Sequence, residues 1–519
     1  MSRRAVPKAE GAAVSAAAQR VATRSRQLTY GLSILVLLVV LVEAVNIGFY
    51  DPWGDDYFLF RLQGVLANVS MSTLTWVMFG SLFVLLMAGL PLAFVAGGLG
   101  VVFLYLLGDA AMLNIIPSRI FPMMTNPDLA AIPLFIFMAT MLERAGLIEE
   151  LFDAVYQWMG GLHGGLAVAT ILASTILAAM VGVVGAAIVT MGIIALPAML
   201  KRKYDPGIAI GSIMAGGTLG VLIPPSILAI LYAVVAQQSV GELYLGSVLP
   251  GLMLSSLYVL YVVMRTTLKP ELGPPVPMEE RLSMAGKLRL LRGLIAPIAL
   301  VAMVLGLLFA GIATPVEAAG LGSLGAMGVA ALHKRLSLKA LIGASTDTLK
   351  ATSMVLWIIF GASIFVGLYI LQGGQTFITE TILSTGLSAY GILFLMMFLL
   401  VILGMFLDWV GILLLAVPIF VPIVKSLTFD GLFGMPGPTP DAVVLWFGVL
   451  YLINMQMSFL SPPFGYALFY IRGVAPPEIT MATIFRSSLV FLGIQFLALA
   501  LVVIFPVIAT GLPELVYGH

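Results

Sequence analysis

The chain has 519 residues, of which 61% are hydrophobic and 9% are charged, and no soluble core needs so many apolar side chains. The net charge of +1 points to no nucleic-acid partner, and the absence of cysteine excludes disulfides, iron–sulfur clusters and thiolate metal sites. Three scattered histidines and no clustered pair of carboxylates give no basis for an enzyme. The composition therefore predicts an all-α polytopic membrane protein, embedded in a lipid bilayer by about a dozen membrane elements.

The N-terminal part precedes the main membrane region. Residues 1–28 are basic and rich in alanine, and we expect a disordered tail there. Residues 29–76 form an extension whose apolar run, 31–50, is long enough for one additional membrane helix. The apolar segments of this first third give conflicting orientations, so the side of the membrane on which the N-terminus lies stays open.

Basic residues gather in three later loops, at 201–207, 267–293 and 333–339. Loops rich in lysine and arginine remain on the cytoplasmic side of a membrane. We therefore expect these loops to be cytoplasmic and the chain to cross the membrane several times.

A double proline occurs twice within apolar sequence. "LIPPSILAILY" (222–232) returns as "LSPPFGYALFY" (460–470), with five of eleven positions identical. Each copy follows an apolar stretch that glycines interrupt near its centre, at "MVGVVGA" (180–186) and at "GMFLDWVG" (404–411). The loop charges give the two copies opposite directions across the membrane, which predicts an inverted repeat.

These features divide the chain. We expect a first inverted repeat at 77–266, with a re-entrant hairpin at 164–201 and a broken helix at 206–234. A cytoplasmic loop at 267–293 follows. The second repeat, at 294–508, has its hairpin at 390–425 and its broken helix at 442–470, and residues 509–519 form a C-terminal tail.

Broken helices at membrane depth indicate a transport site. Proline removes a backbone donor, and irregular backbone survives in a bilayer only where it is buried in protein or lines a cavity. Discontinuous helices in corresponding places of two halves are typical of secondary transporters, whose unwound carbonyls coordinate Na⁺. One double proline alone would more often be a simple kink. Asp408 is a functional candidate because acids at membrane depth are costly, although an exposed loop carboxylate is the alternative.

The segments around both double prolines resemble a known family. "LPAMLKRKYDPGIAIGSIMAGGTLGVLIPPSILAILY" (196–232), "AAIPLFIFMATMLERAG" (130–146), "TPVEAAGLG" (314–322) and "SFLSPPFGYALF" (458–469) are similar to the large membrane subunit of tripartite ATP-independent periplasmic (TRAP) transporters, the DctM-like permeases. The resemblance covers about 77–508. It implies an elevator transporter of the ion transporter superfamily, in which a mobile domain carries both hairpins and both broken helices.

The resemblance also implies partners, a coupling ion and site residues. The partners are a periplasmic substrate-binding protein and a small four-helix (DctQ-like) membrane subunit, and the substrate is a small organic acid such as a C4-dicarboxylate, imported in symport with Na⁺. A first sodium site would use Gly182, Gly185, Ala186, Gly217, Thr218, Gly220, Pro224, Pro225 and Ser226. A second would use Asp408, Gly411, Ser461, Pro462, Pro463 and Gly465. Many relatives have a serine-rich first tip where this chain has "VGVVGA", so coordination there must use carbonyls.

An alternative with the same architecture is a standalone Na⁺/divalent-anion elevator symporter without a binding protein. No short repeat resembles the filter of a channel. The sequence does not identify the substrate, the number of sodium ions or the oligomeric state.

Overall fold

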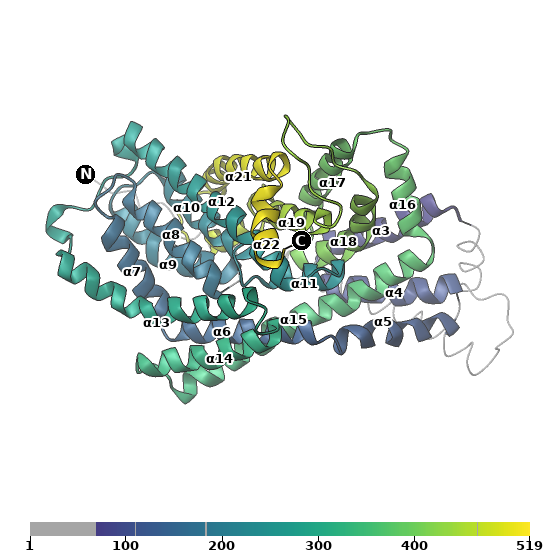
Figure 1. Ribbon diagram of the computed structural model, residues 1–519, viewed down its shortest axis with the longest axis horizontal. Helices are drawn as coiled ribbons and strands as arrows, with labels where there is room; N and C mark the ends of the chain where they lie inside the picture. The colour runs from purple at the N-terminus through teal and green to yellow at the C-terminus, as the bar shows by residue number, and fades with distance from the viewer. Residues whose placement is uncertain (1–68, 109, 182–183, 464, 519) are drawn as a thin grey trace, which may run out of the picture.

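The computed structural model describes residues 69–108, 110–181, 184–463 and 465–518. The predicted tail at 1–28 and the predicted additional helix at 31–50 lie outside these residues. Every regular element in the described part of the chain is helical, as the composition predicts. The molecule is elongated, with the C-terminus near its middle (Figure 1).

The first half of the described chain contains ten α-helices. In chain order they are α3 (Met71–Met87), α4 (Leu92–Gly108), α5 (Ile115–Met124), α6 (Ala131–Arg144), α7 (Leu147–Met159), α8 (Gly165–Val181), α9 (Val184–Lys201), α10 (Pro206–Thr218), α11 (Ile227–Ala236) and α12 (Val240–Leu268). A short 3₁₀ turn, η3 (Leu219–Val221), continues α10.

The second half contains ten more. They are α13 (Met284–Phe309), α14 (Pro315–Leu332), α15 (Leu338–Leu371), α16 (Gly374–Leu383), α17 (Ala389–Gly404), α18 (Trp409–Ser426), α19 (Val443–Leu460), α20 (Tyr466–Val474), α21 (Met481–Ile504) and α22 (Val507–Tyr517).

Eight of the described helices are long and apolar enough to cross a membrane, or nine if the bent pair Met112–Met124 and Pro127–Arg144 is one span. Further apolar helices are shorter, among them α8, α10, α11 and α17, and the predicted dozen membrane elements also included the segment 31–50, which lies outside the described residues. The longest helix, α15, has 34 residues and packs against α4, α6 and α18 along the long axis of the molecule (Figure 1). At 1.5 Å per residue it is about 50 Å long, enough to cross a bilayer with a tilt.

The helix α19 lies at the centre of the fold, and all 18 of its residues are buried. It packs against α12, α17, α18 and α21, and the Trp446 indole donates a hydrogen bond of 2.9 Å to the Val502 carbonyl of α21. Protein therefore surrounds this mostly apolar helix on every side. The second double proline follows directly at the end of this buried helix.

Two segments differ from the expected boundaries. Residues 509–519 were expected to form a tail, but α22 packs against α12 and α19 and buries Ala509 and Pro513. The approach is close, because a Cβ at Gly246 of α12 would lie 2.7 Å from the Ala509 carbonyl. Near the predicted loop 267–293, Ser283 caps α13, which begins ten residues before the expected start of the second repeat. The charged residues at its start are mostly exposed, so the helix extends beyond its apolar part.

Corresponding tyrosines of the two halves each pack on a glycine of the opposite half. The ring of Tyr232, in α11, lies where a Cβ at Gly448 of α19 would come within 2.5 Å. The ring of Tyr470, in α20, lies where a Cβ at Gly185 of α9 would come within 2.8 Å. This exchange fixes each broken helix against the other half of the chain.

The glycine contact yields a stability prediction. Gly448→Ala places a methyl group against the buried Tyr232 ring, and overpacking of this kind costs about 1–3 kcal/mol. We expect thermal unfolding of the purified protein in detergent to shift down by several degrees. Gly493→Ala is the matched control, since no heavy atom lies within 4 Å of a Cβ there and alanine favours helix. Equal unfolding temperatures for both variants would contradict the packing described.

Candidate functional site

The first double proline interrupts a buried helix. The helix α10 ends at Thr218, the turn η3 ends at Val221, and α11 begins at Ile227. Residues 217–226 are all buried. Ser226 caps α11 through a hydrogen bond from the Ala229 amide, and its hydroxyl donates to the Val221 carbonyl. The interruption is therefore an ordered structure within the protein interior.

The interruption leaves a row of carbonyl oxygens without helical donors. The amides of Leu222 and Ile223 both donate to the Leu219 carbonyl, and the two prolines have no amide to donate. Within the described part of the chain, the carbonyls of residues 222–225 accept no hydrogen bond. Buried carbonyls without donors are costly, and they are the type of ligand that an alkali cation binds at such helix breaks.

The second double proline produces a similar interruption. The helix α19 ends at Leu460 and α20 begins at Tyr466, with Ser461 at the end of one and Gly465 at the start of the other. The Gly465 amide donates to the Ser461 carbonyl at 3.0 Å, and the Ser461 hydroxyl donates to the Met457 carbonyl at 2.7 Å. Only glycine fits at 465, because a Cβ there would lie 2.4 Å from the Phe459 carbonyl. The peptide bonds Pro224–Pro225 and Pro462–Pro463 are both cis.

The arms of the first predicted hairpin contact the first break. The helices α8 and α9 pack against each other, and both reach η3. Gly217 lies directly against α9, where a Cβ would approach Ile188 to 2.3 Å. Gly185 and Ala186 lie in the first turn of α9, with Gly185 against Tyr470, while Gly182 is outside the described residues. The structure thus brings Gly217 to this hairpin, together with Gly220 of η3.

Asp408 lies between the arms of the second predicted hairpin, α17 and α18. It caps α18, and its Oδ1 accepts a hydrogen bond of 3.3 Å from the Gly411 amide. The Tyr451 hydroxyl of α19 comes within 3.5 Å of the adjacent Trp409 carbonyl. Gly411 lies between Asp408 and α4, because a Cβ at this position would lie 2.1 Å from Leu92 of α4 and 3.0 Å from Asp408 Oδ1. The structure therefore brings Asp408 and Gly411 together, with Leu92 packed against the glycine.

Two hydroxyls predicted to bind sodium are engaged by the protein. The Thr218 hydroxyl donates to the Ala215 carbonyl at 2.8 Å and accepts from the Gln495 amide at 3.4 Å. The Ser226 hydroxyl is also engaged in the cap just described. Any cation at the first break would therefore rely mainly on the free backbone carbonyls.

Sequence reasoning missed a group of buried polar side chains beside these breaks. Gln495 of α21 is fully buried, and its Oε1 has no hydrogen-bond partner among the described residues. The hydroxyl of Tyr258, on α12, lies near Thr218 and Gln495 without meeting hydrogen-bond geometry with either. Isolated amides in apolar helices were the available signal, because polar side chains within a membrane are expensive.

A second buried pair precedes the second break. Asn454 of α19 donates to the Met397 carbonyl of α17 at 2.9 Å, whereas neither amide atom of Gln456 has a partner in the described chain. Both side chains are fully buried. The polar run "NMQMS" (454–458) was the sequence signal. Asn454 joins two helices, whereas no hydrogen bond within the described residues accounts for Gln456.

The arrangement is that of a membrane transporter, with two helices interrupted at double prolines and polar groups around each interruption; Pro224 and Pro225 are buried, whereas Pro462 is half-buried and Pro463 is exposed. Comparison with known proteins agrees with this class. Residues 79–508 match the family described as the DctM component of the tripartite ATP-independent periplasmic transporter. The chain belongs to this family.

Individual relatives cover nearly the whole family region. The C4-dicarboxylate TRAP transporter large permease protein DctM of Vibrio cholerae is 29% identical over 457 residues, which is 84% of this chain and 96% of the relative. The sialic acid TRAP transporter large permease protein SiaM of the same organism is 28% identical over 84% of this chain and 97% of the relative. Among solved structures, the YdaH transporter of Alcanivorax borkumensis shares the fold, with a TM-score of 0.53 and 14% identity over 84% of this chain and 99% of that one.

The two buried amides of α19 give a matched prediction. Asn454→Leu removes the bond to Met397, and we expect a loss of about 1 kcal/mol in thermal stability, the usual net worth of one hydrogen bond. Gln456→Leu removes two buried polar atoms without partners, so stability should be kept or improved. Thermal unfolding of both purified variants measures this difference. A Gln456→Leu variant less stable than Asn454→Leu would show that Gln456 has a structural partner after all.

Proposed function

We propose that this chain is the large permease subunit of a Na⁺-driven importer for a small organic acid anion. A periplasmic binding protein would deliver the substrate, and a small four-helix membrane subunit would complete the complex in the bacterial inner membrane. Family membership gives the TRAP transporter class. The sodium coupling, the substrate class and the partners are the proposed part.

The observation that carries the sodium assignment is the row of free carbonyls at residues 222–225. Residues 222–225 are buried, and their carbonyls accept no hydrogen bond from the described backbone. They follow α10, which packs against both α8 and α9. Oxygen ligands of this kind suit a hard cation. Asp408 would add one carboxylate to the second site, where Ser461, Pro462, Pro463 and Gly465 form the break.

The mobile part of the elevator would contain α8 to α11 and α17 to α20. In this proposal α8 with α9 and α17 with α18 are re-entrant hairpins, one from each membrane face. Support comes from the exchanged packing, because α9 contacts α20 and α11 contacts α18. Each hairpin therefore holds the broken helix of the other repeat as well as its own.

The substrate follows from the relatives only as a class. The two relatives described above are named for a C4-dicarboxylate and for sialic acid. Both are carboxylates, so an organic acid anion is the shared chemistry. We propose no individual substrate.

Sodium coupling is tested by reconstitution. Proteoliposomes containing this chain and its small subunit, supplied with the binding protein, should accumulate labelled substrate only with an inward Na⁺ gradient. A panel of C4-dicarboxylates and sialic acid would serve as probes, and omission of either partner should abolish uptake. Undiminished uptake driven by a pH gradient in Na⁺-free buffer would refute sodium coupling, and uptake by this chain alone would favour the standalone symporter.

The double proline is tested separately. Replacing Pro224 and Pro225 by alanine lets the helix close, so the carbonyls turn toward backbone donors. Loss of one ligand bond of about 1–3 kcal/mol would weaken Na⁺ binding roughly ten- to a hundredfold. Stability without Na⁺ should be kept or improved, because an interior proline costs a helix about 3 kcal/mol.

The measurement is the Na⁺-induced shift in unfolding temperature. Pro297→Ala is the control, since Pro297 lies inside the continuous helix α13, far along the chain from either break. It should leave the Na⁺-induced shift intact. If the double variant keeps wild-type Na⁺ affinity, these prolines are simple kinks.

A further inference from the structure

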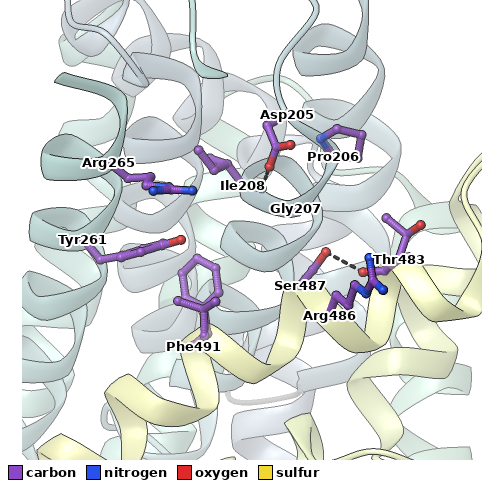
Figure 2. A pocket seen from close by; sticks show the side chains of 11 residues that line it. Asp205, Pro206, Gly207, Ile208, Tyr261, Arg265, Thr483, Arg486, Ser487 and Phe491 are labelled. Atoms are coloured by element: carbon purple, nitrogen blue, oxygen red, sulfur yellow. Dashed lines mark hydrogen bonds between the residues drawn. The ribbon is translucent and has the colours of Figure 1, made fainter. Parts of the chain in front are cut away.

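A cavity of about 350 Å³ lies away from both helix breaks, between the first turn of α10, the last turns of α12 and the start of α21. Its polar lining comes from Asp205, Tyr261, Arg265, Thr483, Arg486 and Ser487. Figure 2 shows the Arg265 guanidinium and the Tyr261 hydroxyl extending from α12 toward α10, with Phe491 below them. The cavity therefore joins three helices that are far apart in sequence.

The charge in this cavity is unbalanced. Neither Arg265 nor Arg486 forms an ion pair with any residue that the structure describes. Other arginines at basic loops are paired: Arg144 with Asp347, Arg202 with Glu280, and Arg335 with Glu150. The single lining carboxylate, Asp205, accepts a hydrogen bond from the Ile208 amide as the cap of α10. Two guanidinium groups and one carboxylate thus leave the lining with a net positive charge, which favours an anion.

Some hydrogen-bond donors in the cavity remain available for a ligand with several acceptor oxygens. Two lining hydroxyls are already engaged: the Ser487 hydroxyl donates to the Thr483 carbonyl at 2.7 Å, and the Thr483 and Thr480 hydroxyls are hydrogen-bonded at 3.1 Å. The Tyr261 hydroxyl and the two guanidinium groups have no such partner in the described chain. Guanidinium forks match the geometry of phosphate oxygens.

The position points to the membrane surface. The cavity adjoins the basic loop 201–207, which the positive-inside rule places in the cytoplasm. Val490 lines the cavity and is 44% exposed, and its neighbour Leu489 is 54% exposed. On α12, Leu260 and Met264 beside the lining residues are about half exposed. Apolar side chains on the outer face of two membrane helices provide a surface for acyl chains directly beside the arginines.

We propose that this cavity binds the headgroup phosphate of an anionic lipid from the cytoplasmic leaflet. Basic pockets between membrane helices on this side suit such headgroups. A soluble phosphate would use the same guanidinium groups but would gain nothing from the exposed apolar residues, which favours the lipid. The lipid would bridge α12 and α21 at the base of α10. This site is independent of the proposed sodium sites, and it stands whether or not transport is driven by Na⁺.

The test uses the full-length chain purified in a neutral detergent. Phosphatidylglycerol should raise the unfolding temperature in a saturable way, and phosphatidylcholine should not. Each of Arg265→Gln and Arg486→Gln should weaken the apparent lipid affinity about fivefold, the effect of one basic residue at an anionic surface. The double variant should lose the shift. Arg289→Gln with Arg292→Gln, two exposed positions at the start of α13, is the matched control and should retain it.

Three results would overturn the proposal. An unchanged phosphatidylglycerol shift in the arginine double variant would show that these arginines do not bind the lipid. An equal loss of the shift in the control variant would show a diffuse charge effect. An equal shift from millimolar inorganic phosphate without lipid would identify a soluble anion as the ligand. If a glutamine variant fails to fold, Tyr261→Phe replaces it, since it removes only a free hydroxyl and should weaken lipid binding without loss of charge.

Discussion

The structure depends on one constraint: a polypeptide cannot leave backbone carbonyls exposed to hydrocarbon, because each unsatisfied group costs several kcal/mol. At residues 222–225 the double proline makes continuation of the helix impossible, and four carbonyls remain free in a buried segment. The helices α8 and α9 pack against the turn η3 before this segment, and α12 packs against Ile223, so that protein and not lipid surrounds the free carbonyls. The proposed binding of a cation would recover part of this cost, so the ion would stabilise the fold as well as drive transport.

The positions of the helix interruptions could be predicted from sequence because proline and glycine act locally. Both double prolines lie between helices in the structure, and the paired helices of 165–201 and 389–426 agree closely with the expected spans. The direction in which each side chain points could not be predicted. Apolar side chains occur all around many of these membrane helices, so no amphipathic pattern marks an inner face. The close contact of Gly411 with Leu92 and the hydrogen bond from Gln495 to Thr218, 277 residues away, could therefore not be predicted.

The first helix break offers few side-chain ligands to a cation. The first hairpin tip has valine, glycine and alanine at 184–186. The hydroxyls of Thr218 and Ser226 already hold the end of α10 and the start of α11. These two hydroxyls therefore maintain the shape of the break. A cation bound there, as proposed, would rely mainly on the backbone carbonyls of residues 222–225.

The exchanged tyrosines have a mechanical consequence. Tyr232 is seated on a glycine of the second half and Tyr470 on a glycine of the first. In the proposed elevator, movement of either broken helix would therefore displace the opposite repeat as well. A displacement that began at one interruption would be transmitted to the other, so states in which only one has moved would be disfavoured. Such coupling would limit leakage of the driving ion through incomplete transport cycles.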